Sequence, residues 1–157
     1  MKKSNLYQYR LEQEILGLLN QHKMNCATIE IKIGKYNNYE DKTIVITPIV
    51  EKAADIIVHV VEDCDGIDMV CGKGTNFEIM PQGNSYLKLS SIEEFKEIFK
   101  TVLKGNFEEE ILFNGDSIIK TVGKLKINGK EIKIEHSNSF FNPFLKAKIE
   151  KVKYEPY

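Results

Sequence analysis

The sequence predicts an α+β fold, in which a twisted, mainly antiparallel sheet of about 6–9 strands carries two helices packed on one face. Three observations support this class. Apolar residues recur with a helical period in two separate segments and alternate with polar residues, as in strands, elsewhere. The expected strands come in runs instead of alternating with helices, which argues against a doubly wound parallel sheet. The length of 157 residues and the lack of a linker rich in Pro, Gly or Ser predict one domain over residues 1–157.

Two segments are predicted to be helices. Ser4 can cap the first, whose apolar residues lie on one face and which we expect to end near residue 22. Ser91 and Glu94 have the spacing of a capping box at the start of the second. Gly105 follows its apolar stripe, at the position where a left-handed residue ends many helices. The predicted order is therefore a helix, a run of strands, a helix and a second run of strands.

Alternating apolar and polar residues predict the strands. Residues 55–63 are apolar in both registers, so we expect a central strand that is covered on each face. Asn128 and Gly129 stand between two alternating segments, which predicts a type I′ hairpin turn. Residues 144–154 are predicted to be an edge strand, which its lysines protect from pairing with other chains. The other expected strands are residues 27–36, 43–50, 67–72, 75–80, 106–114, 117–127 and 130–136, with a polar turn at 37–42.

The composition is that of an ordinary globular protein in a reducing compartment. No apolar run approaches the roughly 18 residues that a membrane-spanning helix needs. The first residues lack the apolar region of a signal peptide. The three cysteines, Cys26, Cys64 and Cys71, are odd in number and have no C-x-x-C spacing, which argues against a disulfide framework. We therefore expect a cytoplasmic protein without a membrane partner.

The stretch VCGKGTNFE, residues 70–78, is similar to part of a phosphate-binding loop. The pattern fails, however, because Gly66 lies six residues before Gly72 where the motif needs five, and Gly74 follows Lys73 where it needs Ser or Thr. The next residues alternate like a strand, so no helix N-terminus is available to bind a phosphate. We predict a hairpin turn in which one of these two later glycines adopts a positive φ, and no nucleotide cofactor.

The sequence offers weak candidates for a metal site and for catalysis. Residues 63–66 are similar to the start of a calcium loop, but Gly72 occupies the position of the bidentate glutamate. The three histidines lack the spacing of transition-metal ligands, and we predict no metal. A small cysteine-dependent enzyme stays open as an alternative, because Cys71 and His59 could lie on neighbouring strands as a thiolate–imidazole pair. The competing interpretation is that both are core residues.

Charge is distributed unevenly along the chain. Residues 115–157 carry 9 lysines and 5 acids, a balance of +4, and include several phenylalanines. Lysines beside aromatic residues can bind a nucleic acid, which is a second alternative. This alternative is less favoured, because arginine occurs once, glutamates interleave with the lysines and the pI is about 6.3.

The middle of the chain is acidic. Residues 37–114 carry 15 acids and 7 lysines, a balance of −8. If these acids share one rim of the sheet, they could capture a basic protein domain at an electrostatically enhanced rate. The candidate contact residues are Glu62, Asp63, Asp65 and Asp68, together with Glu40, Asp41 and the aromatic Tyr39. Glu108, Glu109 and Glu110 are a third acidic group that could extend this rim.

The segment GKGTNFEI, followed by the capped helix SIEEFKEIFKTVLKGNFEEEI, resembles the layout of small bacterial toxin-immunity-type proteins. The resemblance covers about residues 67–111. It implies a non-enzymatic cytoplasmic inhibitor that binds a cognate toxin domain tightly, often through an acidic surface. The contact residues named above come from charge alone. The identity of the partner and the oligomeric state are left open.

Overall fold

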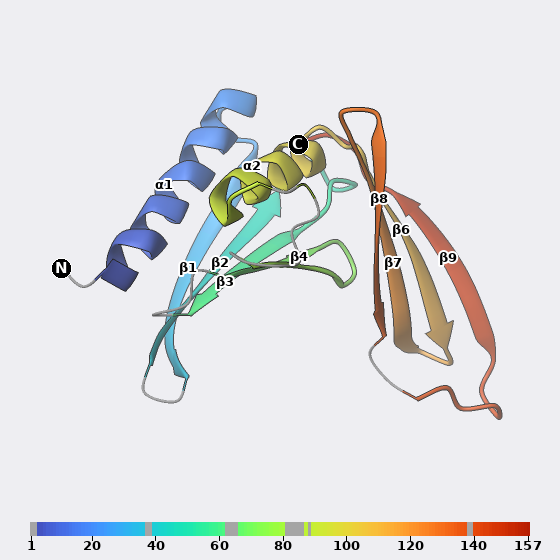
Figure 1. The fold of residues 1–157 in the computed structure, drawn as a ribbon. Coiled ribbons are helices and arrows are strands. Elements are labelled where there is room, and N and C mark those ends of the chain that lie inside the picture. Colours follow the sequence, from blue (N-terminus) through green and yellow to red (C-terminus); the bar gives the residue numbers. More distant parts are fainter. Residues whose placement is uncertain (1–2, 37–38, 62–65, 81–86, 88, 138–139) are drawn as a thin grey trace.

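A computed structural model describes residues 3–36, 39–61, 66–80, 87, 89–137 and 140–157 of the chain (Figure 1). The expected α+β class and the antiparallel pairing of the strands are confirmed. Among the described residues, no helix is long and apolar enough to cross a membrane. The elements are α1 (Lys3–His22), β1 (Ala27–Tyr36), β2 (Tyr39–Pro48), β3 (Ile56–Val61), β4 (Ile67–Cys71), β5 (Thr75–Ile79), α2 (Ser91–Leu103), β6 (Phe107–Asn114), β7 (Ser117–Ile127), β8 (Lys130–Ser137) and β9 (Ala147–Lys153).

The strands form two antiparallel sheets instead of one. The first has the order β1-β2-β3-β4-β5, and the second has the order β8-β7-β6-β9. The two sheets are separated in the sequence by α2, and β6 pairs with β7 and β9 rather than with β5. Periodicity in the sequence predicts each strand but not its partner, because strand pairing is decided by packing between distant segments. The predicted edge position of the last strand is confirmed for β9.

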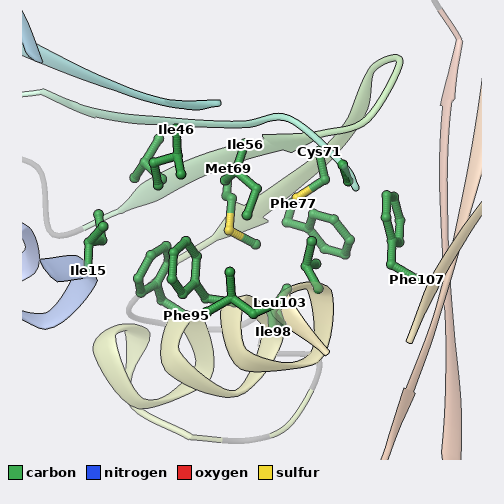
Figure 2. Packing of buried hydrophobic residues seen from close by; sticks show 14 of the residues in the cluster. Ile15, Ile46, Ile56, Met69, Cys71, Phe77, Phe95, Ile98, Leu103 and Phe107 are labelled. Atoms are coloured by element: carbon green, nitrogen blue, oxygen red, sulfur yellow. The ribbon is translucent and has the colours of Figure 1, made fainter. Parts of the chain in front are cut away.

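Both helices lie on one face of the five-stranded sheet, as expected (Figure 1). The main core fills the space between α2 and this sheet, where Met69, Phe77 and Phe95 are fully buried (Figure 2). Phe107 at the start of β6 belongs to the same hydrophobic cluster, so the core extends to the second sheet. Burying each of these large side chains contributes about 1.5–3 kcal/mol to stability.

The β4–β5 hairpin joins the two sheets by packing against β7. Gly123 has no side chain at the point where Thr75 approaches its backbone, and an added Cβ atom would overlap with that threonine. The hydroxyl of Thr121 donates a hydrogen bond to the backbone oxygen of Gly74 (3.3 Å). The C-terminal segment after β9 contacts α2, because the backbone N–H of Tyr157 donates a hydrogen bond to Leu103 O at the end of that helix (3.0 Å).

Two predicted hairpin turns and one predicted helix end are confirmed by backbone conformation. Asn128 and Gly129 both have positive φ angles, 49° and 76°, as a type I′ turn requires. Gly72 and Gly74 also have positive φ (63° and 140°), so the glycine-rich stretch is a hairpin turn. Gly105 (φ 72°) follows α2, and the N–H groups of residues 105 and 106 donate to the carbonyl oxygens of residues 102 and 101, which is a Schellman motif.

Three local predictions are wrong. Ser4 does not cap the first helix, because α1 already begins at Lys3. Residues 39–42 were expected in a turn but form the beginning of β2, because the β1–β2 ladder extends to the pair Tyr36–Tyr39. The capping box is absent: Ser90 caps α2 without a side-chain hydrogen bond. Ser91 instead hydrogen-bonds Tyr7 of α1 (2.9 Å), and buried Glu94 accepts a hydrogen bond from the backbone N–H of Leu87 (3.1 Å). Contacts between elements therefore replace the local cap.

Candidate protein-binding face

The candidate site is the face of the five-stranded sheet opposite the helices, called the open face below. Three apolar residues cross its middle as direct neighbours in the ladders, Val45 on β2, Ile57 on β3 and Val70 on β4. Ile57 is 38% exposed, whereas Ile56 and Val58 on the other face are fully buried. The expectation that this strand is covered on both faces is wrong, because both helices pack on the same side of the sheet. An apolar row is left on the surface.

A charged row runs next to the apolar row. The ladders place His59 opposite Asp68, and Asp68 opposite Glu78 on β5. Asp68 and Glu78 are both exposed, and two like charges directly opposite each other destabilise a sheet. Loss of hydration on the sheet raises the pKa of Asp68 above its ordinary value of 3.8; the charge of Glu78 raises it further, and His59 opposes the shift.

Asp41 joins this row from β2. Its Oδ1 atom lies 2.9 Å from His59 Nε2, a short contact between ionisable groups that is not aligned as a hydrogen bond. The other ring nitrogen, Nδ1, lies 3.3 Å from the hydroxyl of Thr43. His59 therefore stands between two of the predicted contact residues, Asp41 and Asp68. Sequence reasoning missed His59 and Glu78 as members of the site, although their alternation with buried neighbours assigns them to the open face.

The other predicted contact residues are distributed differently. Tyr39 is exposed and, by strand alternation, belongs to the same face as Asp41. Glu40 has the opposite parity, on the side of Lys42, which forms an ion pair with Glu12 of α1 (2.9 Å). Glu40 is therefore not part of the open face. Glu62, Asp63 and Asp65 lie outside the described residues.

The third acidic group, Glu108 to Glu110, does not extend the rim. It belongs to β6 of the second sheet. Glu110 lies near the lysine nitrogens of Lys124 (3.6 Å) and Lys151 (3.8 Å). Glu109 is almost completely buried. The acidic residues therefore belong to two different sheets. Their closeness in the sequence does not predict this separation.

Glu109 occupies the loop that is similar to a phosphate-binding motif. Its Oε2 atom accepts a hydrogen bond from the backbone N–H of Lys73 (2.8 Å), and its Oε1 atom accepts from the N–H (3.0 Å) and the hydroxyl (2.6 Å) of Thr75. The hydroxyl of Tyr154 donates to Oε2. A Cβ atom at Gly72 would overlap with this carboxylate. The loop thus binds an anion, but the anion is a side chain of the same protein.

The proposed pair of Cys71 and His59 is not formed. Cys71 is opposite Ile56 in the ladder and faces the core, whereas His59 is on the open face. Burial, and to a smaller extent the charge of Glu109, raises the pKa of the Cys71 thiol well above its ordinary value. The interpretation of Cys71 as a small buried hydrophobe is confirmed. In the described part of the chain, no three His, Cys, Asp or Glu side chains are grouped as metal ligands.

Four lysines of the second sheet lie within 4 Å of a carboxylate. Lys120 lies 2.5 Å from Glu135, and Lys133 lies 3.4 Å from Glu131. The two lysines near Glu110 follow the same pattern. Such interleaved charges provide weak attraction to a phosphate backbone, which requires cations clustered on one face. The pairing of these four lysines gives the nucleic-acid alternative no support.

The comparisons with known proteins give one partial similarity. No protein-family model and no solved structure matches the chain. A curated protein, the human "Ribosome biogenesis protein BMS1 homolog", is 25% identical over 155 residues. The match covers 90% of this chain and 12% of that protein. The chain therefore spans a small part of that protein's length, and the similarity does not assign a family.

Proposed function

We propose that the protein is a non-enzymatic binding module of the immunity type, which neutralises a toxic protein by covering the toxin's active surface with its open face. The pairing of Asp68 with Glu78 is the observation that carries this proposal. Two carboxylates directly opposite each other lower the stability of the free protein. A lysine or arginine of a partner placed between them would remove that repulsion.

The surroundings of this pair support binding to a protein. The apolar row of Val45, Ile57 and Val70 lies beside the charged row and provides apolar area that a partner can cover. Tyr39 is an exposed aromatic on the same face, a residue type that often contributes strongly at interfaces. A central apolar area with charges around it is the usual arrangement of a protein–protein interface.

The proposed mechanism is steric and electrostatic occlusion. A basic toxin surface would be steered toward the acidic row of Asp41, Asp68 and Glu78, which speeds the encounter at low ionic strength. Contact with the apolar row would then slow dissociation. The bound module would block access of the substrate to the toxin without any chemical step of its own.

The test uses the protein encoded by the gene next to that of this chain, which the proposal expects to be toxic when it is expressed alone. Growth rescue on co-expression and binding measured by calorimetry are expected for the natural protein. The variant Asp68→Lys/Glu78→Lys should weaken binding by about a hundredfold or more, as expected when two central charges are reversed. The variant Glu131→Lys/Glu135→Lys, with the same charge change on the second sheet, is the matched control and should bind as the natural protein does.

The two possible failures are distinguishable. If the neighbouring toxic protein is neither bound nor neutralised, the immunity function is refuted. If it is bound and neutralised but both double variants bind equally well, the function stands and the open face is the wrong surface.

A further inference from the structure

The strand β1 forms one edge of the five-stranded sheet (Figure 1). It has ten residues, contains no proline and pairs with β2 in one continuous register. Within the described part of the chain, no strand pairs with its outer side. A long edge offers free backbone groups to another strand, and proteins usually shorten such an edge or interrupt it with a bulge or a proline. β1 is neither short nor interrupted.

Every second residue of β1 directs its backbone groups away from β2. The backbone N–H of Ile49 donates to Cys26 O just before the strand (2.9 Å). The next pair is Ala27 with Pro48, and proline has no N–H to donate. In an antiparallel ladder, pairs that exchange hydrogen bonds alternate with pairs that do not. The even-numbered residues of β1 therefore bond to β2, and the N–H and C=O groups of residues 27, 29, 31, 33 and 35 point outward.

The residues with outward backbone groups also carry exposed apolar side chains. Ile31 is 40% exposed and Ile33 is 66% exposed. Both belong to the face that the helices cover, because the ladder pairs Ile31 with Ile44, a member of the hydrophobic core. The core buries Ile44 on β2 but leaves its neighbours on the edge strand partly uncovered. A further strand beside β1 would cover them, and burial of apolar surface favours association.

The charges on the other face of β1 select a second copy of the same strand. Glu30 and Lys32 are both exposed, and Glu30 Oε1 lies 3.5 Å from Lys32 Nζ. When two β1 strands pair antiparallel about a two-fold axis at Ile31, each Glu30 faces Lys32 of the other copy. These are pairs without backbone hydrogen bonds, in which opposite side chains are closest. Moving the register by two residues in either direction would instead place Glu30 opposite Glu30, or Lys32 opposite Lys32.

We propose that the protein forms a symmetric dimer in which two β1 strands pair antiparallel around Ile31 and join two five-stranded sheets into one. This register pairs residues 27–35 of both copies and places Ile29 opposite Ile33 on the face with the helices. The two-fold axis is perpendicular to the sheet, so both open faces stay uncovered and lie on the same side of the dimer. The dimer does not depend on the proposed immunity function, and it would present the open face twice.

The other sheet edges fit a second copy less well. The edge strand β9 has a similar charge spacing, since Lys148 lies 3.5 Å from Glu150. A pairing that matches these charges would be centred on Ile149 and would include only residues 147–151 of β9, with one isoleucine from each copy. On the edge strand β8, both isoleucines are already buried. The remaining edge strand, β5, belongs to the hairpin that packs against the second sheet. β1 offers the longest ladder and the most uncovered apolar side chains.

Sedimentation velocity over a series of protein concentrations up to roughly 1 mM tests the dimer. The natural protein is expected to show an equilibrium between monomer and dimer. Glu30→Lys and Lys32→Glu should each raise the dissociation constant of the dimer at least about tenfold, because each places two pairs of like charges opposite each other. An equimolar mixture of these two variants should dimerise again, since every opposed pair then consists of a lysine and a glutamate.

Two further variants locate the interface. Glu150→Lys makes the same charge change at the corresponding position of β9, and it should dimerise like the natural protein. Ile33→Pro removes an outward N–H group without removing a hydrogen bond to β2, and it should also weaken the dimer at least about tenfold.

Thermal melts should show that the charge variants stay folded, because the replaced side chains are exposed. The proposal is overturned if the natural protein stays monomeric at roughly 1 mM, or if the mixture of the two β1 charge variants does so. A dimer that Glu30→Lys and Lys32→Glu leave unchanged, or that Glu150→Lys weakens equally, would also overturn it, because the interface would then lie on another edge or face.

Discussion

The carboxylate of Glu109 in the second sheet accepts three hydrogen bonds from the β4–β5 hairpin of the first sheet, and replacing it by glutamine tests how the sheets are joined. The natural side chain accepts two backbone hydrogen bonds, from Lys73 and Thr75, and two hydroxyl hydrogen bonds, from Thr75 and Tyr154. Glutamine has the same shape but only one oxygen. If that oxygen keeps the contacts with Thr75, its amide group faces Lys73 N and Tyr154. The tyrosine hydroxyl can rotate and accept, but the backbone N–H cannot.

The expected loss of stability follows from the hydrogen bonds that the glutamine cannot make. Hydrogen bonds to a charged group contribute about 1.5–3 kcal/mol, whereas neutral ones contribute about 1 kcal/mol, and a buried unsatisfied N–H costs about 1–3 kcal/mol. The lower desolvation cost of a neutral amide offsets part of this. We expect Glu109→Gln to lower the free energy of unfolding by about 2–4 kcal/mol, which corresponds to a decrease in Tm of roughly 4–16 °C for a chain of this size.

Denaturant unfolding followed by circular dichroism measures this change. Tyr154→Phe removes one donor and should destabilise by about 1–2 kcal/mol. Lys73→Ala is the matched control, because the contact uses the backbone N–H and the lysine side chain is exposed; its effect should stay within about 0.5 kcal/mol. An unfolding free energy of Glu109→Gln within about 0.5 kcal/mol of the natural protein would refute the role assigned to this carboxylate.

Three further predictions concern the surfaces. Glu78→Gln should raise the free energy of unfolding and weaken binding of a basic partner, because it removes one of the two opposed carboxylates. It should also lower the pKa of Asp68, which NMR titration measures; an unchanged pKa would contradict the pairing of the two carboxylates. Because the pKa of Asp68 is raised on folding, its contribution to stability is full below pH 3.8 and is lost as the pH rises through the folded value. The free energy of unfolding of Asp68→Asn should therefore rise relative to that of the natural protein as the pH rises through that window. A difference in unfolding free energy that does not depend on pH would contradict the raised pKa of Asp68. Asn114→Ala should increase hydrogen exchange at the Asn142 and Leu145 amides and lower the free energy of unfolding by about 1–3 kcal/mol. Unchanged exchange would show that Asn114 does not hold the turn at residues 142–145.

Sequence reasoning identified part of the site. Asp41 and Asp68 were predicted from charge, and the structure brings them to opposite sides of His59. Glu78 and the apolar row could not be selected, because their importance depends on which residues face each other across strands. Glu109 was grouped with exposed acids, although its alternation with Phe107 assigned it to the buried face of its strand. A glutamate at an apolar position was the available signal for a buried contact.

The sequence by itself determined the local structure. The helix period, the alternation of the strands and the Asn128-Gly129 and Gly105 positions specify elements and turns through interactions between near neighbours, and these were predicted with few errors. Only the tertiary structure decided that the strands form two sheets, that Cys71 and His59 lie on opposite faces, and that the loop after Cys71 binds Glu109 instead of a phosphate. These outcomes depend on packing between segments far apart in the chain, which local periodicity does not encode.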